Sequence, residues 1–203
     1  MKSIALILAR GGSKGIPDKN IINLKQKPLL AYSILAAKNS KVDEVWVSTD
    51  CKKIKNVAID YGAKVLDRPK NYATDTSKSE DALIHFSENI NFDIMVFIQP
   101  TSPLINSEDI NSGLLMMQNS NHNYDSVFSA YKEHWLPRWS LDNKPKSWKI
   151  NNRPMRQDVE KQYVENGAFY ITSKEALINS RLRYSGNIGI IEMPFSRSFQ
   201  VDT

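Results

Sequence analysis

Short apolar runs alternate with segments of helical period along this chain, and this alternation constrains the fold more than any other feature. The first apolar run, at residues 4–9, precedes a segment in which Leu30, Ile34 and Leu35 recur at helical spacing. The run at residues 95–98 is wholly apolar, as expected of a strand buried on both faces of a parallel sheet. The expected strands cover residues 4–9, 45–48, 65–66, 95–98, 126–129, 167–171 and 188–193, and the expected helices cover residues 29–38, 52–61, 79–90 and 106–119.

This order of elements predicts a layered α/β fold with right-handed crossovers. The 203 residues fit a single domain, residues 1–203, that can bury a proper core. Asn106 is the expected N-cap of its helix, because Glu108 and Asp109 follow in the first turn, where the helix dipole favours acidic side chains. The sequence shows no internal repeat and no low-complexity segment.

The alternation breaks at about residues 132–158, which are polar and rich in tryptophan and proline. Exposed tryptophans such as Trp135, Trp139 and Trp148 are costly unless another surface covers them. We therefore expect an arm or hairpin that projects from the sheet and contacts a second subunit. The alternative is a long loop folded back onto its own domain.

A loop with the sequence ARGGSKGIPDKN, residues 9–20, follows the first expected strand. Its glycines do not have the G-x-G-x-x-G spacing of a dinucleotide fingerprint, and Pro17 and an extended segment at residues 21–24 follow where a helix would begin. The P-loop pattern G-x-x-x-x-G-K-[ST] is also absent. Arg10, Lys14 and Lys19 bring three positive charges to the end of a strand, where open α/β sheets bind ligands. This arrangement suits a triphosphate, and the alternative is a solvated turn.

The overall charge agrees with a small anionic ligand. The 27 basic and 22 acidic residues give a net charge of +5, and the cations are scattered rather than massed in blocks. A nucleic-acid module is disfavoured, since the stacking aromatic pattern of such modules is missing. Cys51 is the only cysteine, which indicates a reducing compartment. The apolar run before Arg10 is too short for a signal peptide or a membrane span, so we expect a cytoplasmic protein without membrane contact.

The glycine-rich loop resembles the signature loop of the acylneuraminate cytidylyltransferases, the CMP-sialic acid synthetase family that activates sialic acid and related nonulosonic acids. Six further segments match that family in the same order along essentially the whole chain. They are V-S-T-D at 47–50, Y-A-T-D-T at 72–76, Q-P-T-S-P-L at 99–104, R-Q-D at 156–158, N-G-A-F-Y at 166–170 and V-D-T at 201–203.

The resemblance implies a three-layer, Rossmann-like nucleotidyltransferase sheet with a protruding arm, and an enzyme that joins CTP to a nonulosonic acid, releasing pyrophosphate. Such phosphoryl chemistry depends on positioning, cations and Mg²⁺ more than on a nucleophilic side chain. By resemblance, Arg10, Lys19 and Asp202 are the catalytic residues, with Asp202 the Mg²⁺ ligand. The nucleotide-binding residues implied are Arg10, Gly11, Gly12, Ser13, Lys14, Lys19, Asn20, Arg68, Asp75 and Ser79, the last three on the cytosine side.

The sugar-acid pocket implied by the family comprises Gln99, Arg156, Gln157, Tyr163, Asn166 and Phe169. A guanidinium suits the substrate carboxylate, and aromatic faces suit its apolar edge. In this family the partner subunit's arm completes the pocket, so the resemblance implies a homodimer. Simpler roles compete: Gln99 as a strand terminator before Pro100, and Ser79 as the cap of the helix that follows.

One departure from the family pattern concerns the metal. The family usually has Asp-Ile-Asp, two carboxylates that can share Mg²⁺, whereas this chain has Gln200-Val201-Asp202. Relatives also continue into a C-terminal helix beyond the position of Thr203, so we expect a trimmed or short form. A cytidylyltransferase for another 3-deoxy sugar acid, an enzyme using a different nucleotide, and a catalytically weakened nucleotide-binding protein remain open. His85, His122 and His134 are scattered, and with Cys51 they suggest structural roles.

Overall fold

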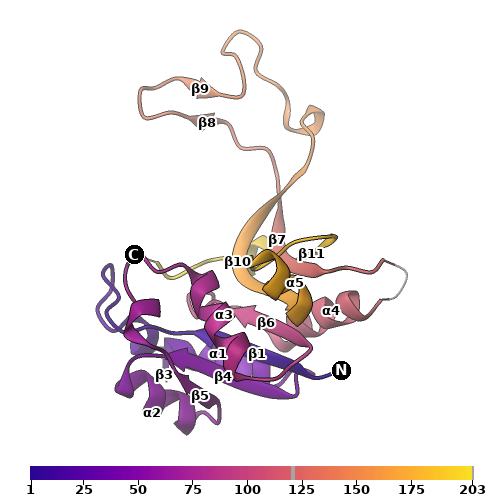
Figure 1. Ribbon diagram of the computed structural model, residues 1–203. Helices are drawn as coiled ribbons and strands as arrows, with labels where there is room; N and C mark the ends of the chain where they lie inside the picture. The colour runs from indigo at the N-terminus through magenta and orange to yellow at the C-terminus, as the bar shows by residue number, and fades with distance from the viewer. Residues whose placement is uncertain (120–121, 203) are drawn as a thin grey trace.

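A mostly parallel seven-stranded sheet forms the centre of the computed structural model, which describes residues 1–119 and 122–202 (Figure 1). The sheet has the strand order β11-β7-β10-β6-β1-β4-β5. Strand β10 is antiparallel to both β6 and β7, while the other neighbouring pairs run parallel. Its strands are β1 (Ser3–Leu8), β4 (Glu44–Thr49), β5 (Lys64–Asp67), β6 (Ile94–Ile98), β7 (Ser126–Glu133), β10 (Gln162–Ser173) and β11 (Ile188–Glu192).

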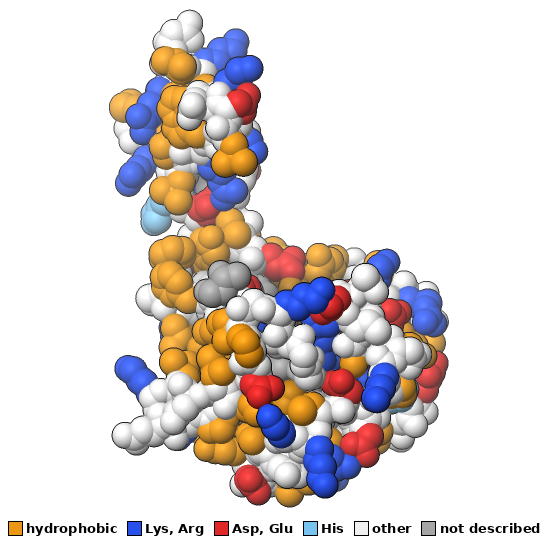
Figure 2. Space-filling model, turned by 90° about the vertical axis from the view of Figure 1, so that its left-hand side faces the viewer, with side chains coloured by type: hydrophobic (Ala, Val, Ile, Leu, Met, Phe, Trp, Pro, Cys, Tyr) orange, Lys and Arg blue, Asp and Glu red, His pale blue; other side chains and the backbone are white. Residues whose placement is uncertain are grey.

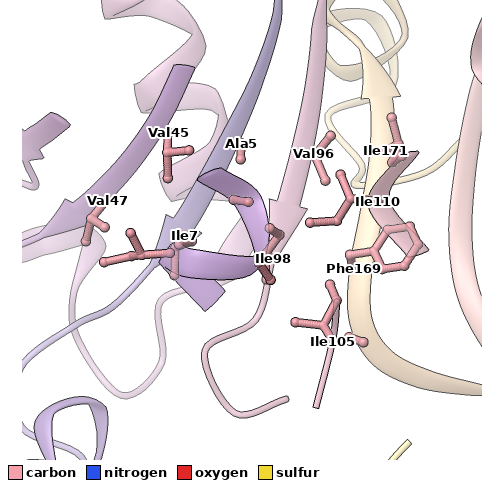
Figure 3. Close-up of a cluster of buried hydrophobic side chains, with 14 of the residues drawn as sticks. Ala5, Ile7, Val45, Val47, Val96, Ile98, Ile105, Ile110, Phe169 and Ile171 are labelled. Carbon is pink, nitrogen blue, oxygen red and sulfur yellow. The ribbon is translucent and has the colours of Figure 1, made fainter. Parts of the chain in front are cut away.

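Helices cover both faces of this sheet, because alternate strand residues point to opposite sides. Ala5 and Ile7 of β1 pack toward α1, α2 and α4, whereas Ile4 and Leu6 pack toward α3 and α5. Figure 3 shows part of the first cluster, with Val96 and Ile98 of β6 beside Ile110 of α4. The helices are α1 (Leu29–Lys38), α2 (Lys52–Asp60), α3 (Ser79–Asn89), α4 (Ser107–Gln118) and α5 (Lys174–Ser180). The expected three-layer α/β fold is confirmed.

Short elements complete the chain between the larger ones. The two-residue strands are β2 (Asn23–Leu24), β3 (Lys27–Pro28), β8 (Arg138–Trp139) and β9 (Pro145–Lys146), and the 3₁₀ turns are η1 (Lys19–Ile21), η2 (Lys70–Tyr72), η3 (Arg156–Asp158) and η4 (Phe195–Arg197). The extended segment expected at residues 21–24 is therefore shorter, since Ile21 closes a 3₁₀ turn. None of the helices within residues 1–119 and 122–202 has the length and apolar character to cross a bilayer.

Two helix starts test the capping expectations. Asn106 is the N-cap of α4 as expected: its Oδ1 accepts a hydrogen bond from the Asp109 N–H at 3.0 Å, and the Asp109 carboxylate accepts one from the Asn106 N–H at 3.1 Å. The alternative role for Ser79 is wrong, because Lys78 is the N-cap of α3 and Ser79 is the first helical residue. Ser79 therefore keeps its hydroxyl available to its surroundings rather than to the helix end.

The segment between β7 and β10 extends away from the sheet as an arm, residues 134–161 (Figure 1). The arm begins slightly later than expected, because β7 continues to Glu133. It ends at residue 161, because β10 begins at Gln162 rather than at residue 167. The arm does not fold back over the sheet. Its tryptophans cover one another in part: Trp148 packs edge-on against Trp139 and Trp135, with ring centroids 5.1 and 6.4 Å apart.

Exposed apolar side chains remain on the arm despite this packing. Figure 2 shows hydrophobic groups interleaved with Lys and Arg over its surface. Leu141, Ile150 and Met155 are all exposed, and Trp139 is about half exposed. An apolar surface of this kind on a projecting segment is typical of a protein–protein contact.

Candidate active site

A pocket of about 380 Å³ lies where the carboxyl ends of β1 and β6 meet, the position at which open α/β sheets bind ligands. The glycine-rich loop that follows β1 forms one side, and the segment after β6 forms the other. The pocket is lined by Leu8, Arg10, Ser13, Lys14, Gly15, Lys19, Asn20, Ser79, Phe97, Gln99, Pro100, Thr101 and Asp202. Eight of the residues implied by the resemblance thus come together in one place: Arg10, Ser13, Lys14, Lys19, Asn20, Ser79, Gln99 and Asp202.

Two hydrogen bonds hold the glycine-rich loop in shape. The buried Asn20 side chain donates from Nδ2 to the Arg10 carbonyl at 3.0 Å, so the two ends of the loop are drawn together. The Gly11 N–H donates to Asp50 Oδ1 at 2.8 Å, which ties the loop to the end of the neighbouring strand β4. The fit at Gly11 is close: a Cβ there would lie 3.1 Å from the Cβ of Cys51.

The loop cations face carboxylates on two sides of the pocket. The Asp75 carboxylate lies 2.9 Å from Arg10 Nη1 and 2.7 Å from Lys14 Nζ. The hydrogen bond from Lys14, and to a lesser extent that from Arg10, lowers the pKa of the Asp75 carboxyl below its ordinary value. Lys19 Nζ lies 3.3 Å from Asp202 Oδ1. Although Lys19 and Asp202 are 183 positions apart in sequence, Figure 1 shows the C-terminal end beside the loop. A bound phosphate could take the place of Asp75 and Asp202 as the partner of these cations, because it pairs with the same donor groups.

Several contacts tie the C-terminal segment, residues 194–202, to helix α4 and to the loop that follows β6. Arg197 forms a two-pronged pair with the buried Asp109, with Nη2 donating to Oδ1 at 2.8 Å and Nη1 donating to Oδ2. The Val201 N–H donates to the Thr101 carbonyl at 2.8 Å. These contacts bring Asp202 to the pocket.

Gln99 and Gln200 face each other across Gly167. Gly167 has φ +65°, and a side chain there would collide with the Gln200 side-chain amide and approach the side-chain oxygen Oε1 of Gln99. Gln200 Nε2 donates to the Asn166 carbonyl. The position that carries the first acid of the family pattern is thus occupied by an amide engaged with the backbone of β10.

Arg68, Gly11, Gly12 and Asp75 lie beside the main pocket rather than in it. Gly11, Gly12 and Asp75 line an adjoining hollow together with Asp50. Arg68 is 7% exposed and donates from Nε to Ser48 Oγ at 3.1 Å and from Nη2 to the Ser48 carbonyl at 2.5 Å. Burial lowers the pKa of its guanidinium to about 10. It lines a third hollow with Thr49 and Asp67.

The residues that the resemblance assigns to the sugar acid, apart from Gln99, do not lie at the pocket of their own chain. Phe169 is fully buried against α4, and Asn166 is 4% exposed, its amide engaged with Ser129 and Ser198. Arg156 and Gln157 are exposed on η3 of the arm. Tyr163 lies at the base of the arm, where its hydroxyl donates to Glu192 at 3.0 Å.

Asp202 is the described carboxylate on the main pocket that could hold a metal. Mg²⁺ commonly takes one or two protein carboxylates, phosphate oxygens and water, so this residue fits such an ion without a second acid. Among residues 1–119 and 122–202, no group of three or more His, Cys, Asp and Glu side chains comes together. His85 lies 5.4 Å from the Tyr72 ring and His122 lies 5.5 Å from the Tyr124 ring, distances between ring centroids.

Sequence reasoning missed six residues of the site, which are Leu8, Asp50, Gly15, Phe97, Pro100 and Thr101. Phe97 and Thr101 line the pocket, and Asp50 fixes the glycine-rich loop. Phe97 belongs to an apolar strand, so its residue type gave no signal beyond burial. Asp50 carried a usable signal, since an acid at the end of a strand beside the first strand can reach the loop that follows it.

The fold and the pocket together define a layered α/β protein with a cationic loop at the carboxyl edge of its sheet. A family profile described as cytidylyltransferase matches residues 4–190. The chain belongs to the cytidylyltransferase family.

The relatives agree with this assignment. N-acylneuraminate cytidylyltransferase B of Danio rerio is 41% identical over 98% of this chain and 48% of its own length. The pseudaminic acid cytidylyltransferase of Campylobacter jejuni is 30% identical over the whole chain and 92% of its own length. The chain therefore spans about half the length of the first relative and nearly all of the second. The resemblance stated from the seven motifs is confirmed.

A solved structure agrees with the fold. CMP:2-keto-3-deoxy-manno-octonic acid synthetase in complex with CTP superposes with a TM-score of 0.74 and 19% identity, covering all of this chain and 94% of that one. At this identity the likeness concerns the fold alone.

Proposed function

We propose that this protein joins CTP to a nonulosonic acid, giving a CMP-sugar and pyrophosphate. The observation that carries the proposal is the meeting of Arg10, Lys14, Lys19 and Asp202 on one pocket in a chain of the cytidylyltransferase family. The named relatives act on N-acylneuraminate and pseudaminic acid, which are sugar acids of this class. The single cysteine supports a reducing, cytoplasmic setting for the reaction.

In the proposed reaction the anomeric hydroxyl of the sugar acid attacks the α-phosphate of CTP, and the bond to pyrophosphate breaks. Arg10 and Lys14 neutralise phosphate charge, and Lys19 stabilises the charge that develops as pyrophosphate leaves. Ser13 and Asn20 contact the phosphates or ribose, while Arg68, Asp75 and Ser79 are assigned to the cytosine side. Asp202 would hold Mg²⁺ together with phosphate oxygens, and the ion supplies further neutralisation of charge.

The sugar acid is assigned to the side of the pocket formed by Phe97, Gln99 and Thr101. We propose that a partner subunit's arm completes this side, so that Arg156 and Gln157 act across a homodimer interface. Their exposure on the projecting arm supports this arrangement, because within one chain they do not reach the pocket. A guanidinium delivered in this way can pair with the substrate carboxylate.

The test is pyrophosphate release with each of four nucleoside triphosphates combined with each of several sugar acids. We expect release with CTP and N-acetylneuraminate or another nonulosonic acid, dependent on Mg²⁺. Release only with a different 3-deoxy sugar acid or nucleotide would reassign the substrate. Tight CTP binding by calorimetry without turnover would instead identify a binding protein.

The Gln200→Asp variant tests the departure from the family pattern. A second carboxylate beside Asp202 should strengthen Mg²⁺ binding, because the ion accepts up to two such ligands. We expect the Mg²⁺ concentration for half-maximal rate to fall by about threefold or more, with a matching shift in Mn²⁺ affinity measured by electron spin resonance. Gln200→Asn is the matched control, since it makes the same change of length without the charge. Equal metal affinities in the two variants would show that Asp202 suffices.

The homodimer is tested by sedimentation velocity over a range of concentrations. The double variant Leu141→Ser, Ile150→Ser removes two exposed apolar side chains from the arm, each of which stabilises a covered interface by about 1.5–3 kcal/mol. The two losses together predict that the Kd of the dimer rises by about 10²–10⁴-fold. The control is Ile59→Ser, which removes an exposed apolar side chain from α2, away from the arm. It should leave the dimer unchanged. A monomeric wild type would contradict the proposal.

A further inference from the structure

A charged and aromatic cluster lies outside the residues assigned so far. Its centre is Arg183, which follows α5 and whose Nε donates to Glu80 Oε1 at 2.7 Å. The guanidinium carbon lies 5.1 Å from the ring centroid of Tyr170 and 5.7 Å from that of Phe97. On the far side of Tyr170, Glu165 accepts hydrogen bonds from the hydroxyls of Tyr170 and Tyr184, the second at 3.4 Å. We call these residues, Glu80, Glu165, Tyr170, Arg183 and Tyr184, the Arg183 cluster.

The Arg183 cluster borders the active-site pocket. Phe97 lines the pocket on its sugar side and also contacts Arg183. At its other end, Glu165 lines the hollow at the base of the arm together with Tyr163. The Arg183 cluster therefore lies between the sugar side of the pocket and the base of the arm. The glycine-rich loop, where the triphosphate is assigned, lies on the opposite side of the pocket.

Tyr170 is buried, whereas the charged side chains of the cluster are only partly withdrawn from solvent. Arg183 retains 24% of its side-chain exposure and Glu80 retains 19%. Burial opposes the charge on Arg183, but the Glu80 carboxylate and, to a lesser extent, the Tyr170 hydroxyl more than compensate and raise the pKa of the guanidinium. A guanidinium carries five N–H donors in a fixed plane, of which Glu80 takes the one on Nε. The guanidinium also interacts with the Tyr170 hydroxyl. Its remaining N–H groups, and the oxygen lone pairs of the exposed Glu165 carboxylate that the two tyrosines leave unused, offer donors and acceptors near the pocket.

We infer that Arg183 determines sugar-acid specificity by binding a hydroxyl-bearing exocyclic chain of the substrate. This inference rests on the proposed function. With the reacting end of the acid beside the phosphates, its remote chain extends past Phe97 toward the Arg183 cluster. Hydroxyl groups both donate and accept, so Arg183 can donate to them and Glu165 can accept from them. Tyr170 itself is buried between the rings of Phe97 and Tyr184, so it holds Arg183 in place rather than contacting the substrate.

The same geometry selects against a sugar acid whose exocyclic chain is short or ends in a methyl group. Such a substrate would cover Arg183 without pairing its N–H groups. Leaving a charged donor unpaired costs more binding free energy than leaving a neutral donor unpaired. We therefore expect the protein to prefer acids of the N-acylneuraminate class over acids with a deoxygenated chain end.

The test measures binding and turnover separately. Calorimetry gives the Kd of N-acetylneuraminate, and of its seven-carbon analogue lacking the last two chain carbons, with CDP and Mg²⁺ present. Wild type should bind the full-length acid about tenfold more tightly than the analogue. In Arg183→Met we expect the Kd of the full acid to rise by about tenfold, that of the analogue to stay within about twofold, and CTP affinity to be unchanged. Arg183→Lys should lie between wild type and Arg183→Met.

The control is Arg181→Met, which removes an exposed cation two positions away on the same segment. It should leave both sugar affinities unchanged. Unchanged affinity in Arg183→Met, an equal loss for both acids, or no preference of wild type for the full acid would overturn the inference. Should Arg183→Met fail to fold in thermal melts, Arg183→Lys carries the same comparison. Turnover by wild type is the separate readout: its absence would refute the proposed function, while the two Kd values still decide the role of Arg183.

Discussion

Replacing Arg10 with alanine is expected to lower kcat/KM for CTP by about 10²–10³-fold, the range seen when one preorganised group that stabilises a transition state is removed. Arg10 follows β1, and its guanidinium lies on the pocket 2.9 Å from Asp75, an acid that a phosphate can displace. The substitution leaves the loop closed, because Asn20 bonds to the backbone carbonyl of residue 10 rather than to its side chain. Steady-state pyrophosphate release with circular dichroism provides the measurement.

Lys41→Ala is the control for this variant, since it removes an exposed cation at the opposite end of the sheet. Its rate should match that of wild type. Near-normal turnover in Arg10→Ala would contradict the assignment of the loop to the triphosphate. A matching loss in Lys41→Ala would instead point to general electrostatic attraction of the nucleotide.

Replacing Asp109 with alanine is expected to lower the free energy of unfolding by about 3 kcal/mol. Asp109 is 7% exposed and pairs with Arg197 through both oxygens, and removing one partner of a buried pair costs about 3–5 kcal/mol. We expect the lower end of that range because the Arg197 side chain is 28% exposed. Urea unfolding monitored by tryptophan fluorescence measures the change.

The neighbouring Glu108→Ala is the matched control, because Glu108 is exposed in the same helical turn and should change stability by about 0.5 kcal/mol or less. Asp109→Asn retains the capping geometry while removing the charge, so it separates the two roles of the carboxylate. Since Arg197 anchors the segment that carries Asp202, Asp109→Ala should also raise the Mg²⁺ requirement of the reaction. A destabilisation no larger than that of Glu108→Ala would show that Arg197 contributes little.

The central elements of the fold could be predicted because their strands are apolar on both faces. Residues 95–98 and 4–8 carry this signal, and the helix at residues 29–38 has the expected bounds. The outer ends of β7 and β10 could not be predicted, because Lys132 and Tyr163 pair through backbone groups, which polar composition does not reveal. Helix α5 was missed for a related reason: it has seven residues and buries only Leu177.

The site was predictable where charge carried the information. Arg10, Lys14 and Lys19 stand in one loop, and their charges indicated a phosphate ligand from sequence alone. Residues brought together by the topology were harder. Phe97 could not be distinguished from other core residues, and Arg183 acquires its surroundings only because β6 and β10 are neighbours in the sheet. The sugar-side assignments of Phe169 and Asn166 came from a motif, which does not reveal to which face of the sheet each side chain points.

The way in which the arm is attached has a consequence for how such a protein can change. Its two ends are hydrogen-bonded neighbours, since Glu133 of β7 pairs with Gln162 of β10. A segment that leaves and re-enters the sheet at one place can be lengthened, shortened or exchanged at little entropic cost, because loop closure depends only weakly on length. The exposed apolar surface of the arm can therefore diversify, or be transplanted between homologues, while the layers that hold the pocket at the carboxyl ends of β1 and β6 stay the same.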